Sequence, residues 1–304
     1  MYYIKRLLSI VITLWIIATI TFIIMRVIPG DPFTDERSLP PEIIKAMMQY
    51  YGLDAPLYKQ YLKYIWQLLE GDLGPSLKYP GRQVKEIITM GFPASALLGI
   101  CAVCISLVTG IFFGAMAAAN HQRWPDYLGM TVAVIGISVP SFVIATFLQY
   151  FFAIYLGWLP IARWGTWAHV FLPALSLSFL PTAFIARLTR STLLEVLEKD
   201  YIRTAAAKGL NRYQILIFHA LPNALLPVVS YLGPLIASIL TGTFIIERIF
   251  GIPGLGGWLI NSIGNRDYPI IMGITLFYSA ILLSITFLMD LIYRWIDPRI
   301  QLKG

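Results

Sequence analysis

The chain has 304 residues, of which 58% are hydrophobic and only 13% are charged. Soluble domains are about half apolar and about a quarter charged, so this composition leaves too little polar surface to cover a water-soluble fold. The formal net charge of +7 comes from Lys and Arg residues scattered between apolar runs. This distribution argues against a nucleic-acid partner and fits basic loops beside membrane lipid.

Six stretches are apolar and long enough, at about 20 residues, to cross a bilayer as helices. They are Leu8–Val27, Ala94–Ala119, Tyr127–Leu156, Val170–Thr192, Ala224–Ile246 and Pro269–Tyr293. The sequence therefore predicts an all-α integral membrane protein with about six transmembrane helices. Lys5 and Arg6 before the first stretch are typical of a signal peptide, but the apolar run is too long and no good cleavage site follows. We expect an uncleaved first span.

Lys and Arg residues gather in alternate short loops, which sets the expected orientation. If the N-terminus is cytoplasmic, the short outside loops carry only Arg163, Arg248 and Arg266, and the other short-loop basic residues lie inside. The sequence thus predicts a multi-pass protein of the cytoplasmic (inner) membrane with both termini cytoplasmic. Pro140, Pro173 and Pro181 lie within spans, and these kinks favour a bundle that lines a path.

The long loop from Ile28 to Phe92 is expected outside, and it contains two helical patterns. Pro41–Tyr51 and Tyr58–Leu69 have apolar residues at helical spacing, and they end near Gly52 and Gly71. Two short helices on the outer membrane surface are predicted, either as a cap on the bundle or as a ligand domain. The predicted division is a first part, 1–93, with the first span and this loop, and a five-helix core, 94–304.

The segment from Glu195 to Pro227 follows the fourth span and is predicted to be cytoplasmic. Apolar and small residues recur there at helical spacing: Ile202, Ala205, Ala206, Gly209 and Leu210. They predict a short helix with one shallow face, followed by a second helix, Arg212–Ala220, that ends where Leu221-Pro222 forces a break. The face suits docking into a groove on a partner, although an amphipathic helix lying in the membrane interface has the same pattern.

The run Arg203-Thr204-Ala205-Ala206-Ala207-Lys208-Gly209 is followed, after nine residues, by His219-Ala220-Leu221-Pro222. This spacing resembles the EAA loop of ABC-importer permeases, whose usual form is Glu-Ala-Ala, three residues, Gly, nine residues, then Ile-x-Leu-Pro. Arg203 replaces the usual acid and His219 replaces the Ile, and both departures are typical of the peptide and nickel branch. The resemblance implies a type I ABC importer permease fold.

In that family the loop, here 195–222, is a coupling helix that sits in a cleft of the ATPase subunit. The resemblance implies that the contact with the ATPase is made by residues of this loop: Arg203, Thr204, Ala205, Ala206, Lys208, Gly209, Leu210, His219, Leu221 and Pro222.

Further segments along nearly the whole chain resemble the same branch. They are Pro29–Pro32, Tyr51–Asp54, Gln60-Tyr61, Gly71–Gly74, Val139–Phe142, Gly251–Gly256, Arg266–Tyr268 and Asp297–Arg299. Pro32–Glu42 and Gly74–Tyr79 resemble its oligopeptide-transporting members more narrowly. The resemblance implies a permease subunit for oligopeptides, working with a sister permease, two ABC ATPases and an external peptide-binding protein. Dipeptides, nickel chelates or sugars as cargo remain alternatives, as does a scaffold or channel without an ATPase.

The sequence carries no sign of its own catalysis. It has no G-x-x-x-x-G-K-[ST] phosphate loop, so ATP and Mg are expected on partner ATPase subunits and this chain is not expected to be an enzyme. The three histidines have no metal-ligand spacing, and Cys101 and Cys104 read as small buried hydrophobic residues. We expect no catalytic residue, cofactor or metal on this chain.

Two sets of polar residues are candidates for the transport path. A salt-bridged outer gate is predicted at the Gly-rich loop Gly251–Gly257. Its residues are Glu247, Arg248, Arg266 and Asp267, which flank the loop, and Gly254 within it. Small polar residues in the spans are candidate path residues, although they also serve in helix packing: Ser138, Ser141, Thr241 and Thr243. Asp290 and Arg294 have the spacing of an i,i+4 ion pair at the end of the last span.

Overall fold

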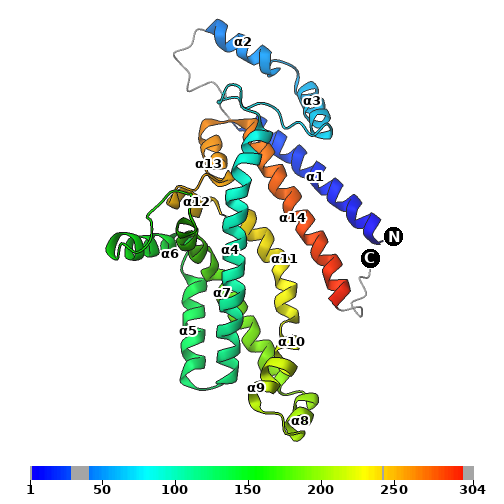
Figure 1. Ribbon diagram of the computed structural model, residues 1–304. Helices are drawn as coiled ribbons and strands as arrows, with labels where there is room; N and C mark the ends of the chain where they lie inside the picture. The colour runs from blue at the N-terminus through cyan, green and yellow to red at the C-terminus, as the bar shows by residue number, and fades with distance from the viewer. Residues whose placement is uncertain (1, 29–40, 242, 297–304) are drawn as a thin grey trace. The chain divides into compact units, whose positions relative to one another are not determined.

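The computed structural model describes residues 2–28, 41–241 and 243–296. Its elements in chain order are α1 (Tyr2–Val27), α2 (Pro41–Tyr51), α3 (Leu57–Leu69), α4 (Val84–Ala119), α5 (Trp124–Ser138), α6 (Ser141–Leu148), a π-helical segment (Gln149–Tyr155), α7 (Trp167–Leu197), α8 (Asp200–Ala207), α9 (Arg212–Gln214), a second π-helical segment (Ile215–Ala220), α10 (Leu221–Ala224), α11 (Leu226–Thr241), α12 (Phe244–Phe250), α13 (Leu255–Asn265) and α14 (Tyr268–Ile296) (Figure 1). The prediction of an all-α fold is confirmed. Of the family-like segments, Pro29–Pro32, most of Pro32–Glu42 and Asp297–Arg299 lie outside the described residues.

Four helices are long and apolar enough to cross a membrane on their own, namely α1, α4, α7 and α14. Two bent helix pairs also pass the same test of length and composition, which gives up to six spans in the described part of the chain. The prediction of about six spans therefore agrees with the structure, but the third and fifth spans are not continuous helices.

The third span breaks where Pro140 follows Val139. A residue before proline is held out of the helical region, and Val139 is extended, with φ −93° and ψ 123°. The helix therefore ends at Ser138, and the two helical halves meet at 106°. The kink expected at Pro140 is therefore present in the predicted span Tyr127–Leu156, as a full break between two helices.

The fifth span bends by 49° between Ala224 and Leu226. The helical chain runs through Pro222, so the predicted break at Leu221-Pro222 was wrong. Pro222 lies just after the point where the second π-helical segment, ending at Ala220, passes into α10. At the other end α11 stops at Thr241, and Ile246, predicted as the end of this span, belongs to the separate helix α12.

Both short helices of the long loop form as predicted, with α3 beginning one residue early at Leu57. Each ends in a Schellman motif, in which the second N–H beyond the helix reaches back to a carbonyl of the last turn. Leu53 donates to Met48 at 2.8 Å, and Asp72 donates to Gln67 at 2.9 Å. The sequence signal for these helices was strong because the stop signals and the apolar spacing agreed.

The described chain divides into two compact units. The first unit contains Met1–Pro93 and Gly254–Leu283, and the second contains Ala94–Pro253 and the end of α14. In the first unit the N-terminal turns of α4 pack against α13 and α14 through buried residues that include Val84, Leu255 and Ile270. This packing explains why α4 begins ten residues before the predicted span.

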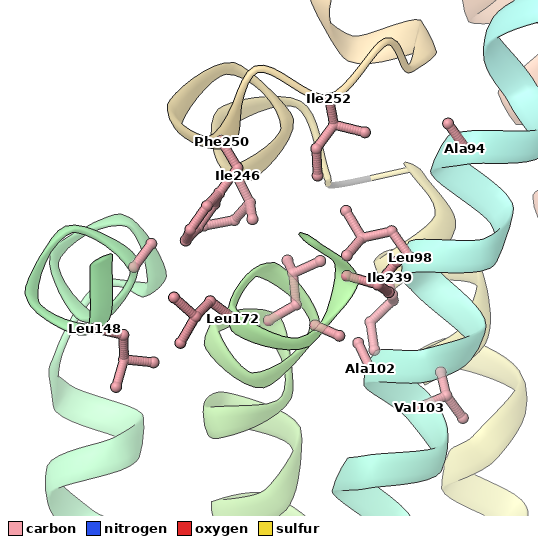
Figure 2. Packing of buried hydrophobic residues seen from close by; sticks show 14 of the residues in the cluster. Ala94, Leu98, Ala102, Val103, Leu148, Leu172, Ile239, Ile246, Phe250 and Ile252 are labelled. Atoms are coloured by element: carbon pink, nitrogen blue, oxygen red, sulfur yellow. The ribbon is translucent and has the colours of Figure 1, made fainter. Parts of the chain in front are cut away.

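The core of the second unit joins α4, α6, α7, α11 and α12. Figure 2 shows Leu98 of α4, Leu172 of α7, Ile239 of α11 and Phe250 of α12 turned toward a shared interior, and each is at most 7% exposed. Fully buried aliphatic and aromatic side chains of this kind each contribute about 1.5–3 kcal/mol in water. In lipid the gain comes mainly from close packing instead.

The backbones of α4 and α7 approach each other closely at two glycines one turn apart, Gly110 and Gly114. A Cβ atom on Gly114 would lie 2.5 Å from the carbonyl oxygen of Ala186, and one on Gly110 would lie 2.8 Å from the Cβ of Ile185. Small residues four apart allow such an approach between membrane helices. Any larger side chain at these positions would force the two helices apart.

We expect Gly114→Ala to lower the thermal unfolding midpoint of the purified protein, because overpacking of a tight contact costs about 1–3 kcal/mol. The matched control is Gly264→Ala in α13, where an added Cβ meets nothing within 4 Å. The control should leave the midpoint unchanged or raise it slightly. Equal midpoints for the two variants, measured by size-exclusion chromatography after heating, would contradict the tight α4–α7 contact.

Candidate functional site

The loop that follows α7 folds into a short helix with defined ends. Lys199 is the extended residue before α8, and Gly209 ends the helix with φ +85°. Leu210 then donates its N–H to the carbonyl of Ala205 at 3.4 Å, and Gly209 donates to Ala206 at 3.0 Å. Only glycine adopts this left-handed conformation without strain, so Gly209 ends the helix as predicted.

One face of α8 is turned into the chain. Ile202 and Ala205 are 6% and 5% exposed. They pack in an apolar cluster with residues from α4, α7 and the second part of the loop: Ala118, Leu193, Ile215, Ala220 and Ala224. Leu210 and Leu221, both predicted partner contacts, pack against the same cluster. Ala205, predicted at the contact with a partner, therefore lies inside this chain.

The opposite face of α8 is exposed and carries mostly short side chains. Its residues are Arg203, Thr204, Ala206, Ala207, Lys208 and Gly209. Arg203 lies 3.8 Å from Asp200, but both side chains are largely in solvent, so the pair adds little stability. Because these side chains are mostly short, another protein could approach the helix backbone here.

The second helix of the loop begins with a capping box. Asn211 accepts the N–H of Gln214 at 2.8 Å, and the Gln214 side chain accepts the N–H of Asn211 at 3.1 Å. The helix then leaves two large aromatic side chains exposed, Tyr213 at 67% and Phe218 at 69%. Sequence reasoning missed these two, although aromatic residues in a polar loop are a usable signal for a partner contact. His219 is half-buried and Pro222 is exposed.

Three side chains fasten the loop to itself and to the spans. The Thr192 hydroxyl of α7 donates to the carbonyl of Ala224 at 2.8 Å. The Asn223 amide donates to the Tyr201 hydroxyl at 3.1 Å, which joins α10 to α8. The Arg212 guanidinium donates to the carbonyl of Ala119, the last residue of α4. The loop is thus a braced unit and not a free linker.

A buried carboxylate ties α5 to α7 beside this loop. Asp126, in the first turn of α5, is 3% exposed and accepts from Arg190 of α7 at 2.5 and 2.8 Å. It also accepts the N–H of Gln122 at 3.0 Å, and His121 Nδ1 lies 3.3 Å away. A two-point Arg–carboxylate contact fixes geometry as well as charge. Sequence reasoning missed this pair because its members are 64 positions apart.

The predicted gate residues are divided between buried and exposed positions. Glu247 is 0% exposed and accepts from the Thr243 hydroxyl at 2.5 Å. Asp267 is also 0% exposed; it accepts the Ser76 hydroxyl and the N–H groups of Leu77 and Lys78. Both acids are buried, and Asp267 accepts backbone N–H groups of the turn at Leu77 and Lys78. Their role in a salt-bridged outer gate stays a prediction.

The basic and glycine members of that set lie near these acids in the chain. Arg248 is exposed on α12, Gly254 is buried directly before α13, and Arg266 is the left-handed residue that ends α13, with φ +57°.

The predicted path residues are also in varied surroundings. Ser138 is exposed and donates to its own helix at the carbonyl of Val134, at 2.8 Å. Ser141 is half-buried at the start of α6, whereas Thr243 is buried and bonded to Glu247. The side chains of Thr241 and Arg294 lie outside the described residues. Their role in a path stays a prediction.

The cysteines were expected to be small buried residues, but Cys104 is exposed on α4 and Cys101 is half-buried. Among the residues described, no group of three His, Cys, Asp or Glu side chains lies close enough together to hold a metal ion.

Two family descriptions match the chain. Residues 110–302 match the family described as "Binding-protein-dependent transport system inner membrane component". Residues 1–77 match its N-terminal companion, "Binding-prot-dependent transport system membrane comp, N-term". The resemblance expected from the loop motif is confirmed over most of the sequence.

Curated relatives match along nearly their full length. The dipeptide transport system permease protein DppB of Bacillus subtilis (strain 168) is 48% identical over 99% of this chain and 98% of its own length. The oligopeptide transport system permease protein OppB of Haemophilus influenzae is 44% identical over 98% of each chain.

Among solved structures, an inward-facing MetNI methionine ABC transporter aligns with a TM-score of 0.58 and 19% sequence identity. The alignment covers 69% of this chain and 96% of that one. At this identity the likeness shows the fold alone, and it confirms the predicted type I ABC importer permease fold.

We expect Asp126→Asn to lower the thermal unfolding midpoint by the equivalent of about 1–3 kcal/mol, because Arg190 then loses its charged partner inside the protein. Arg190→Gln should cost about as much for the same reason.

The double variant Asp126→Asn/Arg190→Gln should cost less than the sum of the two single changes, as for any interacting pair. The control is Lys199→Gln, which breaks an exposed 3.1 Å pair with Glu195 and should leave the midpoint unchanged. Additive losses in the double variant would show that the two side chains do not act together.

Proposed function

Because the chain belongs to the family of inner membrane components of binding-protein-dependent transport systems, we propose that it is the membrane-spanning subunit of an ATP-driven importer of oligopeptides. The observation that carries this proposal is its identity of 42–48% to peptide permeases over at least 98% of the chain. The braced loop with one exposed small-residue face supports it. The family is one of membrane components, so transport and not catalysis is the activity of this chain.

The cargo is the first point on which relatives differ. The two segments Pro32–Glu42 and Gly74–Tyr79 favour oligopeptides, and several OppB proteins are 42–44% identical to the chain. Dipeptides are the alternative, favoured by the 48% identity to DppB. Both candidates are peptides.

The proposed assembly follows from what the chain lacks and what it exposes. A sister permease completes the path, two ABC ATPases bind ATP and Mg, and an external peptide-binding protein delivers cargo. The bias of Lys and Arg toward alternate loops favours cytoplasmic termini and a cytoplasmic position for α8. We also propose that residues 1–93 form a first part, made of the first span and the outer loop with its two short helices, and residues 94–304 the five-helix permease core.

In the proposed mechanism the exposed face of α8 docks into a cleft of an ATPase subunit. Closure of the two ATPases on ATP then moves α8 as a rigid body. Since Thr192, Arg212 and the Ile202 cluster fix the loop to α4, α7 and α10, this motion reaches the spans directly. The path need only differ between two states that ATP biases.

The partner surface can be tested with Ala206→Trp. Ala206 is exposed on α8, so the large side chain should leave the fold intact while blocking close approach of another backbone. We expect at least a tenfold loss of the ATPase subunit that co-purifies, together with loss of peptide uptake. Ala168→Trp is the matched control, because Ala168 is equally exposed at the other end of α7.

Gly209→Asp should weaken the same association, because the change adds a negative charge and strains a residue at φ +85°. Gly209→Asn has the same size without the charge and tolerates this backbone better, so it should retain more of the partner. ATPase association that is unchanged in Ala206→Trp would refute the docking face and favour a scaffold or channel.

Cargo length is tested by uptake of a labelled cargo into cells that carry this transporter, compared with cells from which it has been deleted, in the presence of unlabelled peptides of different length. We expect unlabelled tri- to pentapeptides to compete and dipeptides to compete at least tenfold less well. Competition by dipeptides alone would establish the alternative cargo, and competition by neither would refute peptide import.

A further inference from the structure

The first unit contains a cation, Arg26, that stacks against aromatic rings and has no acidic partner among the described residues. Arg26 lies in the last turn of α1, where a span reaches the edge of the bilayer. Its guanidinium carbon is 5.4 Å from the ring centre of Phe22 and 5.7 Å from that of Tyr268. Ring contacts of this kind occupy the faces of the guanidinium and leave its N–H edge able to bind an anion. Among the described residues, no carboxylate pairs with Arg26.

Arg26 lines a cavity of about 410 Å³ between α1, α2, α3 and the start of α14, whose wall mixes polar and apolar side chains. We call it the polar cavity because both Arg26 and Lys63 line it. The other polar side chains of its wall are Lys63, Gln60, Gln67, Tyr50, Tyr51, Tyr64 and Tyr268, and no Asp or Glu is among its described lining residues. Burial raises the pKa of Tyr64, so this hydroxyl stays neutral and adds no negative charge. Two cations, with no acid beside them among the described lining residues, make the cavity attractive to an anion.

Arg26 also lines a second cavity, of about 390 Å³, which is almost wholly apolar. It runs between α1 and α3, and its other lining residues are Thr19, Phe22, Ile23, Val27, Leu57, Tyr58 and Tyr61. Val27 and Leu57 are 74% and 60% exposed, so the groove has apolar borders on the outer surface of the span. Phe22 and Arg26 line both cavities, so they lie between the polar cavity and the apolar groove.

Side-chain contacts fix the helices that line the two cavities. Phe22 contacts Tyr61 edge-on and Tyr64 face to face, with ring centres 5.4 and 5.7 Å away, and the Thr19 hydroxyl lies 2.8 Å from that of Tyr61. These contacts hold α3 against α1. The buried Asp267 holds the turn that carries Leu77, which lines the polar cavity beside Tyr268.

From this arrangement we propose that the first unit binds an anionic phospholipid, with its phosphate at Arg26 and Lys63 and one acyl chain in the groove along Ile23, Val27 and Leu57. A free phosphate or a peptide carboxylate would satisfy the cations but would leave the groove empty. An amphiphile fills both compartments at once. The end of a span is where basic and aromatic side chains meet lipid headgroups, and in the proposed orientation this is the outer leaflet.

The test is native mass spectrometry of the full-length chain, purified in a neutral detergent with the subunits that co-purify, and titrated with phosphatidylglycerol or phosphatidylcholine. We expect phosphatidylglycerol to bind at least tenfold more tightly. Arg26→Gln should weaken it about 10- to 100-fold, the range for a lost charged hydrogen bond, and leave phosphatidylcholine unchanged. Lys63→Gln should act in the same direction, which keeps the test open if Arg26→Gln misfolds.

Lys59→Gln is the matched control, because Lys59 is exposed on α3 one turn before Lys63 but does not line either cavity. Equal binding of the two lipids, or an equal loss in Lys59→Gln, would overturn the proposal. So would displacement of phosphatidylglycerol by inorganic phosphate or by a short peptide with a free carboxylate at millimolar concentration, since each would show that the groove is not used. If neither inorganic phosphate nor the peptide displaces phosphatidylglycerol, the result would support binding of an amphiphile.

Discussion

The close approach of α4 and α7 at Gly110 and Gly114 is the contact on which the second unit depends. Because no side chain separates the two backbones there, α7 lies directly against α4. The loop that continues from α7 can then reach the end of α4, where Arg212 binds the carbonyl of Ala119. The position of α8 therefore follows from two missing side chains one helical turn apart.

The few buried charges act as fasteners between elements. Asp126 joins α5 to α7 through Arg190, and Asp267 joins the turn at Ser76 to the start of α14. Unpaired charges are expensive away from water, and a satisfied carboxylate fixes several donors at once.

Two surfaces remain with chemistry that the chain itself does not use. The exposed face of α8 carries mostly short side chains, and the helix is held rigidly by the rest of the loop. These properties suit a surface on which a partner exerts force. The cavities around Arg26 combine charge with an apolar groove, which suits an amphiphile. The two proposals rest on different residues of different units, so either one stands or falls without the other.

The sequence by itself determined the all-helical membrane fold, the family, and the helix ends at Gly52, Gly71 and Gly209. These features depend on local composition and spacing, which act over one or two helical turns. It placed α8 but not its orientation: a repeat of small residues does not say which of Ala205 and Ala206 faces inward.

Only the tertiary structure decided that Ala205 is buried, that Glu247 and Asp267 are internal, and that Arg190 pairs with Asp126. It also decided how proline acts, because Pro140 ends a helix whereas Pro222, following a π-helical turn, lies at the start of one. The physical reason is the same in each case. Burial and pairing depend on residues far away in the sequence, and a pattern within one segment carries no information about what will pack against it.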